Sequence, residues 1–308
     1  MRNANTLPAL MVGAAAALWG CIGFFTEYLH AAEFTSLQIV TVRAVMATVL
    51  LFVFLRVYKP SVLYVEPAHY KYFVGTGIIS VCFFNWCYFT AISETSLSVA
   101  VILLYTGPAF VVILSAFLFS ETITLRKGIA LAFTFVGVEL VSGLFPSSVS
   151  TITLYGLLTG LGAGFGYALY SIFSKFALKK YPPLTIIFYT FLFASIFLIP
   201  FTWIVGQPWP AQAATPEFLF MIIGLGFFPT ALAYLLYTEG LNRMEAGRAS
   251  ITAMIEPVTA AAIGVAYFGD ELNVLKIAGI LLILISVSAL YIKAGSDEDQ
   301  TEQDRLRI

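Results

Sequence analysis

The sequence predicts an all-α membrane protein in which ten transmembrane helices form two inverted five-helix repeats. Of its 308 residues, 60% are hydrophobic and only 11% are charged, whereas a soluble domain carries about 25% charged residues. Apolar segments interrupted by proline recur 149 residues apart, and basic residues gather beside alternate connections. The composition predicts a membrane protein, the recurrence predicts a duplication, and the basic residues predict its orientation in the bilayer.

Ten apolar segments are long enough to cross the hydrocarbon core of a bilayer, which takes about 20 helical residues. They span residues 8–28, 34–55, 72–92, 97–118, 127–146, 153–176, 183–205, 217–238, 247–268 and 273–292. These segments leave no stretch for a separate soluble domain. The first is alanine-rich after a single arginine, as a signal peptide is, but its length and the nine similar segments behind it predict that it is retained.

Fourteen of the sixteen Lys and Arg residues lie beside alternate connections, from Arg2 at the start to Arg307 at the end. The opposite connections contain no Lys or Arg and comprise residues 29–33, 93–96, 147–152, 206–216 and 269–272. The two exceptions are Arg43, inside the second segment, and Lys276, just beyond the last of these connections. Because cytoplasmic loops carry the excess of basic residues, we expect both termini to be cytoplasmic in a multi-pass protein of the cell inner (plasma) membrane.

The second half of the chain repeats features of the first at an offset of 149 residues. The matched pairs are Gly77 and Gly226, Tyr88 and Tyr237, Ala100 and Ala249, and Pro108 and Pro257. We interpret Asp270 as one extra residue, after which an offset of 150 aligns Glu121 with Glu271. A fixed offset of this kind predicts two copies of one structural unit.

The duplication predicts two five-helix domains, residues 1–147 and 151–293, joined by Pro146-Ser147-Ser148. Because five is an odd number, the second copy enters the membrane from the opposite side, which gives the inverted repeat of many secondary transporters. In that architecture the binding site lies near the middle of the membrane between the halves. Residues 294–308 are polar and acidic, so we expect a disordered cytoplasmic tail.

Ionisable side chains inside the segments are few, and each costs at least about 2.5 kcal/mol at a helix centre unless it is paired or hydrated. The three deepest are Arg43, Glu139 and Glu256. Glu256 precedes Pro257, and proline leaves a carbonyl of the preceding turn without its donor and bends the helix. We expect Glu256 either to line a water-filled cavity beside this break or to bond a neighbouring helix terminus.

Arg43 and Glu139 have opposite charges at similar depths. At about 1.5 Å per residue, Arg43 lies roughly 13 Å and Glu139 roughly 10 Å below the external ends of their segments. One interpretation is a structural ion pair that fixes the second helix against the fifth, although desolvation offsets much of the attraction in such a pair. The other interpretation is that Arg43 faces the cavity and holds an anionic group of the substrate.

Polar and aromatic side chains lie deep in matched segments of both halves, where a phenol needs a hydrogen-bond partner. Each ring alone is explained by packing, but their joint placement favours a ring-lined pathway. The candidate substrate-binding residues are Asn85, Trp86, Tyr105, Tyr170, Tyr234, Tyr237 and Glu256. We predict that Asn85, Trp86, Tyr105, Tyr170, Tyr234 and Glu256 face one shared central space.

The sequence contains none of the short motifs of metalloproteases, serine hydrolases, intramembrane aspartyl proteases or P-loop nucleotide hydrolases. Its three cysteines, Cys21, Cys82 and Cys87, lie within apolar segments, and their spacing favours neither a metal site nor a disulfide. We therefore expect no cofactor, no metal and no catalytic residue. The net charge of −1 does not indicate a nucleic-acid partner.

Several short motifs combine with the duplication. They are Trp19-Gly20, Arg43, Pro108 followed by Glu121, Glu256-Pro257-Val258, and Glu271. In order and spacing they resemble the EamA-type drug/metabolite transporter superfamily over about residues 8–292. The resemblance implies that segments 1, 3, 4, 6, 8 and 9 surround a central cavity while segments 5 and 10 lie at the periphery. We expect structural or gating roles for Trp19, Arg43, Pro108, Glu139 and Pro257, of which Glu139 departs from the family pattern, because the family usually has an apolar residue there.

The resemblance implies a transporter of small polar metabolites that works by alternating access, with amino acid export as the specific expectation. Its partners would be a small-molecule substrate and the lipid bilayer. A passive channel or an intramembrane enzyme is the alternative, but a channel is more naturally symmetric about the membrane normal than an inverted repeat is. The sequence leaves open whether a proton or ion gradient drives transport and how many copies assemble.

Overall fold

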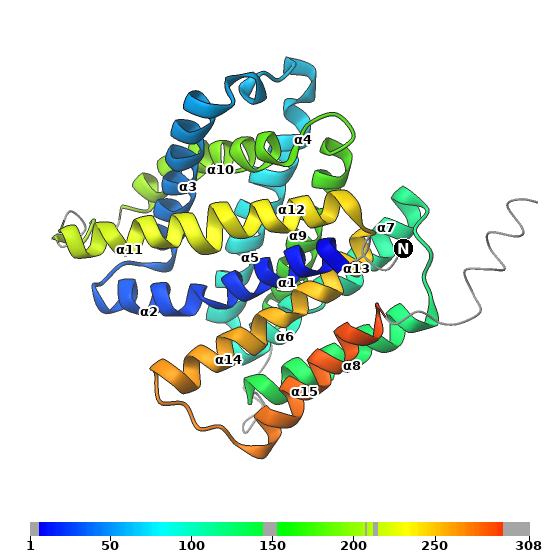
Figure 1. Ribbon diagram of the computed structural model, residues 1–308. Coiled ribbons are helices and arrows are strands. Elements are labelled where there is room, and N and C mark those ends of the chain that lie inside the picture. The colour runs from blue at the N-terminus through cyan, green and yellow to red at the C-terminus, as the bar shows by residue number, and fades with distance from the viewer. Residues whose placement is uncertain (1–5, 144–152, 207, 212–214, 292–308) are drawn as a thin grey trace, which may run out of the picture.

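The computed structural model describes residues 6–143, 153–206, 208–211 and 215–291. The linker Pro146-Ser147-Ser148 and the tail 294–308 lie outside these ranges. In the described ranges all regular structure is helical, and eight helical segments are long and apolar enough to cross a membrane (Figure 1). The chain is thus an all-α, multi-pass membrane protein, and α8 and the shorter apolar helix α15 complete the ten segments.

The first half contains the five predicted membrane-crossing segments, but three of them are divided into more than one helical element. The elements are α1 (Thr6–Gly20), α2 (Ile22–Ala31), α3 (Ser36–Tyr58), η1 (Pro60–Leu63), η2 (Pro67–His69), α4 (Tyr70–Val74), η3 (Gly75–Cys82), α5 (Phe83–Glu94), α6 (Leu97–Leu104), α7 (Gly107–Phe119) and α8 (Leu125–Ser142). The first segment is α1 with α2, the third runs from α4 through the π-helical η3 to α5, and the fourth is α6 with α7.

The second half has the same order of elements with fewer breaks. They are α9 (Leu154–Ala177), α10 (Pro183–Val205), α11 (Pro216–Gly226), η5 (Phe227–Leu232), α12 (Ala233–Arg243), α13 (Ala246–Thr252), η6 (Ala253–Ile255), α14 (Glu256–Tyr267) and α15 (Val274–Ala289). The π-helical η5 stands where η3 stands in the first half. The starts of α6 and α7 map onto the starts of α13 and α14 at the offset of 149 (97 + 149 = 246; 107 + 149 = 256).

The predicted change of register to 150 is wrong, because the structure keeps the offset of 149 through the turn. Ser120 and its counterpart Gly269 both have positive φ, of 56° and 75°. The next helices also begin at equivalent caps: the side chains of Thr124 and Asn273 (124 + 149 = 273) each accept from the backbone three residues on. Asp270 is therefore the counterpart of Glu121, and no residue is inserted.

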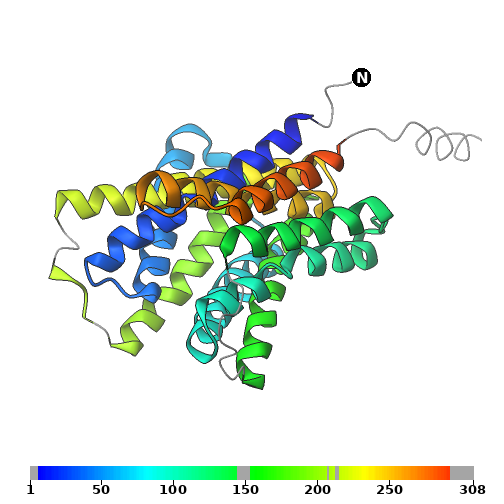
Figure 2. The ribbon, with the colours of Figure 1, turned by 90° about the horizontal axis from the view of Figure 1, so that it is seen from below.

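The fifth and tenth segments, α8 and α15, pack side by side at the edge of the molecule (Figure 1). Figure 2 shows the same pair from below. Their backbones approach closely at two glycines: a Cβ on Gly279 would lie 2.6 Å from the carbonyl oxygen of Gly137. In lipid, small residues allow such close approach and so increase dispersion contacts between helices. The peripheral placement implied by the resemblance is confirmed.

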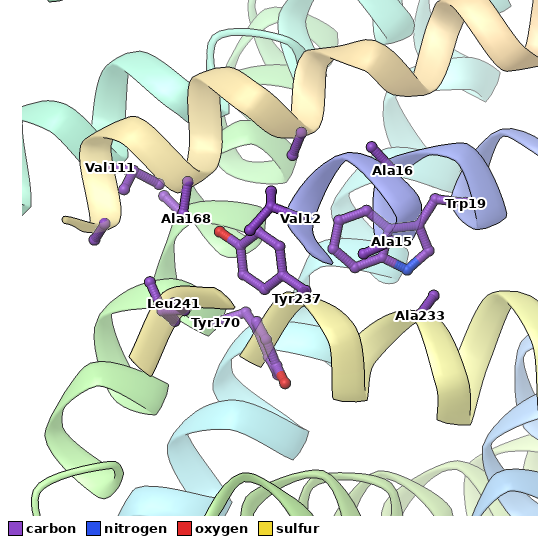
Figure 3. Close-up of a cluster of buried hydrophobic side chains, with 13 residues drawn as sticks. Val12, Ala15, Ala16, Trp19, Val111, Ala168, Tyr170, Ala233, Tyr237 and Leu241 are labelled. Atoms are coloured by element: carbon purple, nitrogen blue, oxygen red, sulfur yellow. The ribbon is translucent and has the colours of Figure 1, made fainter. Parts of the chain in front are cut away.

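One large buried cluster joins the two halves. Val12 and Trp19 of α1 pack against Tyr170 of α9 and against Tyr237 and Leu241 of α12 (Figure 3). The many glycines of α9 let other helices come close. A Cβ on Gly164 would lie 2.9 Å from the carbonyl oxygen of Leu103, where α6 ends. This packing places the broken ends of α6 and α7 beside the centre of α9.

Candidate functional site

A central cavity of about 500 Å³ lies between the two halves. This is the size of an ordinary small-molecule site. Its walls come from the first four segments and from the sixth, eighth and ninth. Among the described residues that line it are Trp19, Arg43, Asn85, Tyr88, Tyr105, Pro108, Tyr167, Tyr234, Met254 and Glu256. Arg43 adds the second segment to the six that the resemblance implied, and no described residue of α8 or α15 lines the cavity.

The cavity extends to one end of the helix bundle. Thr26, His30, Ser36, Ile92 and Leu97 line this mouth. These residues lie beside the connections 29–33 and 93–96, which carry no Lys or Arg. The mouth is therefore at the end that the positions of the basic residues assign to the external side.

Two opposite charges line the cavity. Arg43 projects from the N-terminal half of α3, and Glu256 is the first residue of α14, directly after the short 3-10 turn η6. The break lets a carboxylate sit at a helix N-terminus inside the bundle, where the helix dipole favours negative charge. The close approach of α1 helps to place it, because a Cβ on Gly20 would lie 2.7 Å from the carbonyl oxygen of Glu256.

The predicted ion pair between Arg43 and Glu139 is wrong. Both residues are described, and no ion pair joins them there. The reason is the arrangement of the helices, since α3 packs against α10 and α11 whereas α8 packs against α15. Arg43 instead faces the cavity, as the alternative interpretation held, and Glu139 is half-buried on the peripheral α8.

Four of the predicted substrate-binding residues meet in the cavity: Asn85, Tyr105, Tyr234 and Glu256. Asn85 is held by a hydrogen bond from its amide nitrogen to the carbonyl of Val81, 2.8 Å away. Tyr105 is the C-terminal cap of α6, at the break before α7. The shared space that the sequence predicts therefore exists for these four, while their role in binding stays a prediction.

Trp86 does not face the cavity, which corrects the prediction. Its side chain is 48% exposed on the outer surface of α5 and contacts the ring of Phe83 at a centroid distance of 6.1 Å. Successive residues of an α-helix point about 100° apart. Because Asn85 points inward, its neighbour Trp86 must point toward the lipid-facing side.

Tyr170 and Tyr237 also lie outside the main cavity. Both are buried in the cluster of Figure 3, and both hydroxyls are bonded within the protein: Tyr170 to Thr238 at 2.7 Å and Tyr237 to Ser171 at 2.6 Å. With Trp19 and Tyr234 they border a second, much smaller cavity of about 20 Å³. A space of this size holds about one water molecule.

Trp19 lines both cavities, as Phe84, Tyr167 and Tyr234 also do. Its ring lies 5.2 Å from the ring of Tyr234 and 5.1 Å from that of Tyr237, measured between centroids. The prolines flank the helix breaks: Pro108 lines the cavity at the start of α7, and Pro257 is buried at the start of α14. These positions agree with the expected structural or gating roles, which stay predictions.

The end of the bundle opposite the mouth is closed by charged groups. The two carboxylate oxygens of Glu121 accept hydrogen bonds from the backbone N–H groups of Ala246 and Gly247, at 2.7 and 3.0 Å. Lys127 forms an ion pair with Glu245 at 3.0 Å. The ammonium group of Lys175 donates to the carbonyl of Leu241 at 2.8 Å.

Sequence reasoning missed this closing network. Lys127 and Lys175 count only among the basic residues beside the connections, and nothing local in the sequence indicates that they meet Glu245 and Leu241. Cavity-lining Tyr88 and Tyr167 lie deep in the segments but were not among the predicted contacts. Aromatic residues such as Trp86, Phe117 and Phe220 are also exposed on the outer surface, so an aromatic residue deep in a segment does not by itself indicate a cavity position.

The chain matches the model of the EamA-like transporter family over residues 6–143 and again over residues 154–292. It is similar to a protein of Archaeoglobus fulgidus named an uncharacterized transporter, with 33% identity over 200 residues that cover 65% of this chain and 69% of the relative. Two Bacillus subtilis proteins are also similar. The transporter YwfM is 29% identical over 70% of this chain and 71% of its own length, and YxxF is 24% identical over 93% and 90%.

A solved structure has the same fold. It is a crystal structure of a protein that is 17% identical to this chain, covers 92% of it with 97% of its own length, and superposes with a TM-score of 0.78. At this identity the likeness supports the arrangement of helices alone. The relatives are named as transporters and not as enzymes.

Proposed function

Because the chain belongs to the EamA-like transporter family, we propose that it moves small polar metabolites, and amino acids in particular, across the cell membrane by alternating access. Export is the direction that the resemblance favours. The cavity mouth would then face the outside of the cell, with both termini in the cytoplasm. The proposal places the protein in the plasma membrane.

The observation that carries the proposal is that Arg43 and Glu256, of opposite charge, line one aromatic-walled cavity. A guanidinium group binds a carboxylate with short, charge-assisted hydrogen bonds, and a carboxylate binds an ammonium group in the same way. The cavity thus offers one partner for each charge of an amino acid. Around the charges, Tyr88, Tyr105 and Tyr234 supply apolar faces for the rest of such a substrate.

The closed end favours a carrier over a passive channel. A channel needs a path open to both sides, whereas the bonds from Glu121 to Ala246 and Gly247 close one end while the other is open. Such a one-sided cavity is what alternating access requires of each state. The relatives that the chain matches are named as transporters, which favours transport over catalysis.

A thermal-shift screen of the purified protein tests the substrate class. We expect zwitterionic amino acids to raise the melting temperature, because a ligand at 100 times its Kd stabilises the folded state by about 2.7 kcal/mol. The shift should vanish in Arg43→Gln and persist in Glu139→Gln, a matched change of a charged residue on peripheral α8. Stabilisation by neutral sugars alone, or an equal shift in Arg43→Gln, would refute the proposed class.

A further inference from the structure

Positions related by the 149-residue offset have opposite environments at the two ends of the molecule. Leu97, the first residue of α6, is 58% exposed and lines the cavity mouth, whereas its counterpart Ala246, the first residue of α13, is 0% exposed. Ile92 lines the mouth in the same way, and its counterpart Leu241 is 0% exposed. The two halves share one fold. The contacts that close one end in this structure therefore indicate which equivalent contacts could close the other end when the protein changes conformation.

The closed end depends on a carboxylate at the start of a helix. Glu121 lies in the turn after α7, and its two oxygens accept from the backbone N–H groups of Ala246 and Gly247. Hydrogen bonds from N–H groups to a charged acceptor are stronger than those between neutral groups. Glu121 therefore holds α13 against the turn between α7 and α8 and keeps this end shut.

The counterpart of Glu121 at the open end is Asp270. The turns are equivalent, because the backbone N–H of Glu121 donates to Ser115 at 3.3 Å and that of Asp270 donates to Gly264 at 3.0 Å (115 + 149 = 264). The carboxylate of Asp270, however, bonds the ammonium group of Lys276 at 3.2 Å. In the part of the chain that the structure describes, no residue accepts from the N–H groups of Leu97 and Ser98.

We propose that Asp270 is the latch of the opposite conformation. When the mouth closes, its carboxylate leaves Lys276 and accepts hydrogen bonds from the N–H groups of Leu97 and Ser98, the counterparts of Ala246 and Gly247. Glu121 releases its own partners in the same step, so that the two latches hold the two states in turn. The inference rests on the alternating access proposed above. In it, Glu121 stabilises the state in which the mouth is open, and Asp270 stabilises the state in which the mouth is closed.

The energetic asymmetry between the two partners of Asp270 makes the latch testable. Its present partner Lys276 forms a pair in which the Asp270 side chain is half-exposed, and such surface pairs contribute little. Two charge-assisted bonds to the start of α6 contribute more. Removing the charge of Asp270 should therefore destabilise the closed-mouth state more than the open-mouth state. Glu271, the adjacent acid, is exposed and bonds no described residue, which makes it a matched control.

The experiment measures alkylation of single cysteines by a soluble maleimide in purified, detergent-solubilised protein. Cys21, Cys82 and Cys87 are first replaced by alanine. Ile92→Cys then reports the mouth, and Leu241→Cys reports the end that Glu121 closes. Detergent gives the reagent access to both ends, so the result does not depend on membrane orientation. Elution as a single folded species and an unchanged helical content are required of every variant.

Four variants, each combined with the cysteine reporters, test the proposal. Asp270→Asn should slow alkylation of Leu241→Cys by about fivefold or more, the lower range of typical coupling between conformational states, while Glu271→Gln leaves the rate unchanged. Glu121→Gln should act in the opposite direction and speed alkylation of Leu241→Cys. Asp270→Glu keeps the charge and has the same side chain as Glu121. Alkylation of Leu241→Cys in this variant should therefore be as fast as with the native Asp270.

The possible failures are distinguishable. If Asp270 serves only its pair with Lys276, Asp270→Asn weakens the open-mouth state and speeds alkylation of Leu241→Cys, which overturns the latch. An equal effect of Asp270→Asn and Glu271→Gln overturns it as well. If Glu121→Gln shifts neither reporter, the alternating access on which the latch rests fails instead.

Discussion

At the scale of single residues, Tyr105 has the most specific placement in the cavity wall. It caps α6 at the break before α7 and faces the same space as Glu256. We predict that Tyr105→Ala lowers the transport rate at least several-fold while membrane insertion is preserved, because an aromatic–substrate contact is lost without a change in the helix. Trp86→Ala, on the outer surface of α5, is the control and should transport normally in the same uptake assay. Full activity of Tyr105→Ala would mean that the ring only packs.

Tyr237 offers a prediction about stability. Its hydroxyl bonds Ser171 in the cluster that joins the halves, and its side chain is 1% exposed. Tyr237→Phe leaves a buried partner unpaired, which costs about 1–3 kcal/mol, so the melting temperature should fall by a few degrees. Tyr64→Phe, on a ring that is 77% exposed, should leave it unchanged. Equal melting temperatures for both variants would argue against a contribution from the Ser171 bond.

The sequence predicts which residues lie deep in the membrane but not which way they point. Asn85 and Trp86 are adjacent and equally deep, yet one lines the cavity and the other is exposed. In a soluble helix the polar face indicates the outside, whereas in lipid the outer face is as apolar as the packed interior. The rotation of each helix therefore has to come from the three-dimensional packing.

At the scale of elements, the contact between α8 and α15 predicts where a glycine is indispensable. A Cβ at position 279 would lie 2.6 Å from the backbone oxygen of Gly137 and 2.8 Å from the backbone nitrogen of Val141. Backbone atoms cannot rotate away, so Gly279→Leu should destabilise the protein by about 1–3 kcal/mol or more through overpacking. The matched change Gly128→Leu in α8, where a Cβ meets nothing within 4 Å, should be tolerated. Thermal unfolding of the two variants compares them directly, and equal melting temperatures would show that the contact is loose.

The prolines made some helix breaks predictable and left others hidden. Pro108 and Pro257 indicated the breaks in the fourth and ninth segments, because proline cannot donate within a helix. The π-helical segments η3 and η5 carry no such common signal, since η5 contains Pro229 and η3 contains no proline. In the turns after the fourth and ninth segments, the identity of Glu121 and Glu271 suggests an offset of 150. The positive φ of Ser120 and Gly269 shows instead that the two turns are equivalent at an offset of 149.

At the scale of the whole molecule, the basic residues predict the topology. A reporter enzyme that is active on only one side of the membrane should read cytoplasmic when inserted near Lys179 or fused after Ile308. It should read external when inserted in the connection 206–216, near Gln212, which lies in part outside the described residues. The two sides should differ because fourteen of the sixteen Lys and Arg residues lie beside alternate connections. The same reading at Lys179 and Gln212 would contradict the inverted repeat.

The conformational state explains the remaining difference between the predicted and the observed site. Tyr88 lines the cavity, while its counterpart Tyr237 is buried at the closed end. The sequence places both on equivalent helices, and it holds no information about which end is open at a given moment. In the alternate state that we propose, Tyr237 and Tyr170 would border the open half of the pathway, so the sequence-based site mixes residues of both states.

Counterflow in proteoliposomes tests the central claim, that the Arg43 and Glu256 cavity carries an amino acid by alternating access. Vesicles containing purified protein are loaded with a high concentration of the amino acid that stabilises it, and a trace of the labelled compound is added outside. We predict transient, saturable accumulation of label inside, lost in Arg43→Gln and kept in Glu139→Gln. Linear, unsaturated entry of label that never exceeds equilibrium, with equal rates in both variants, would contradict a carrier with its site in this cavity.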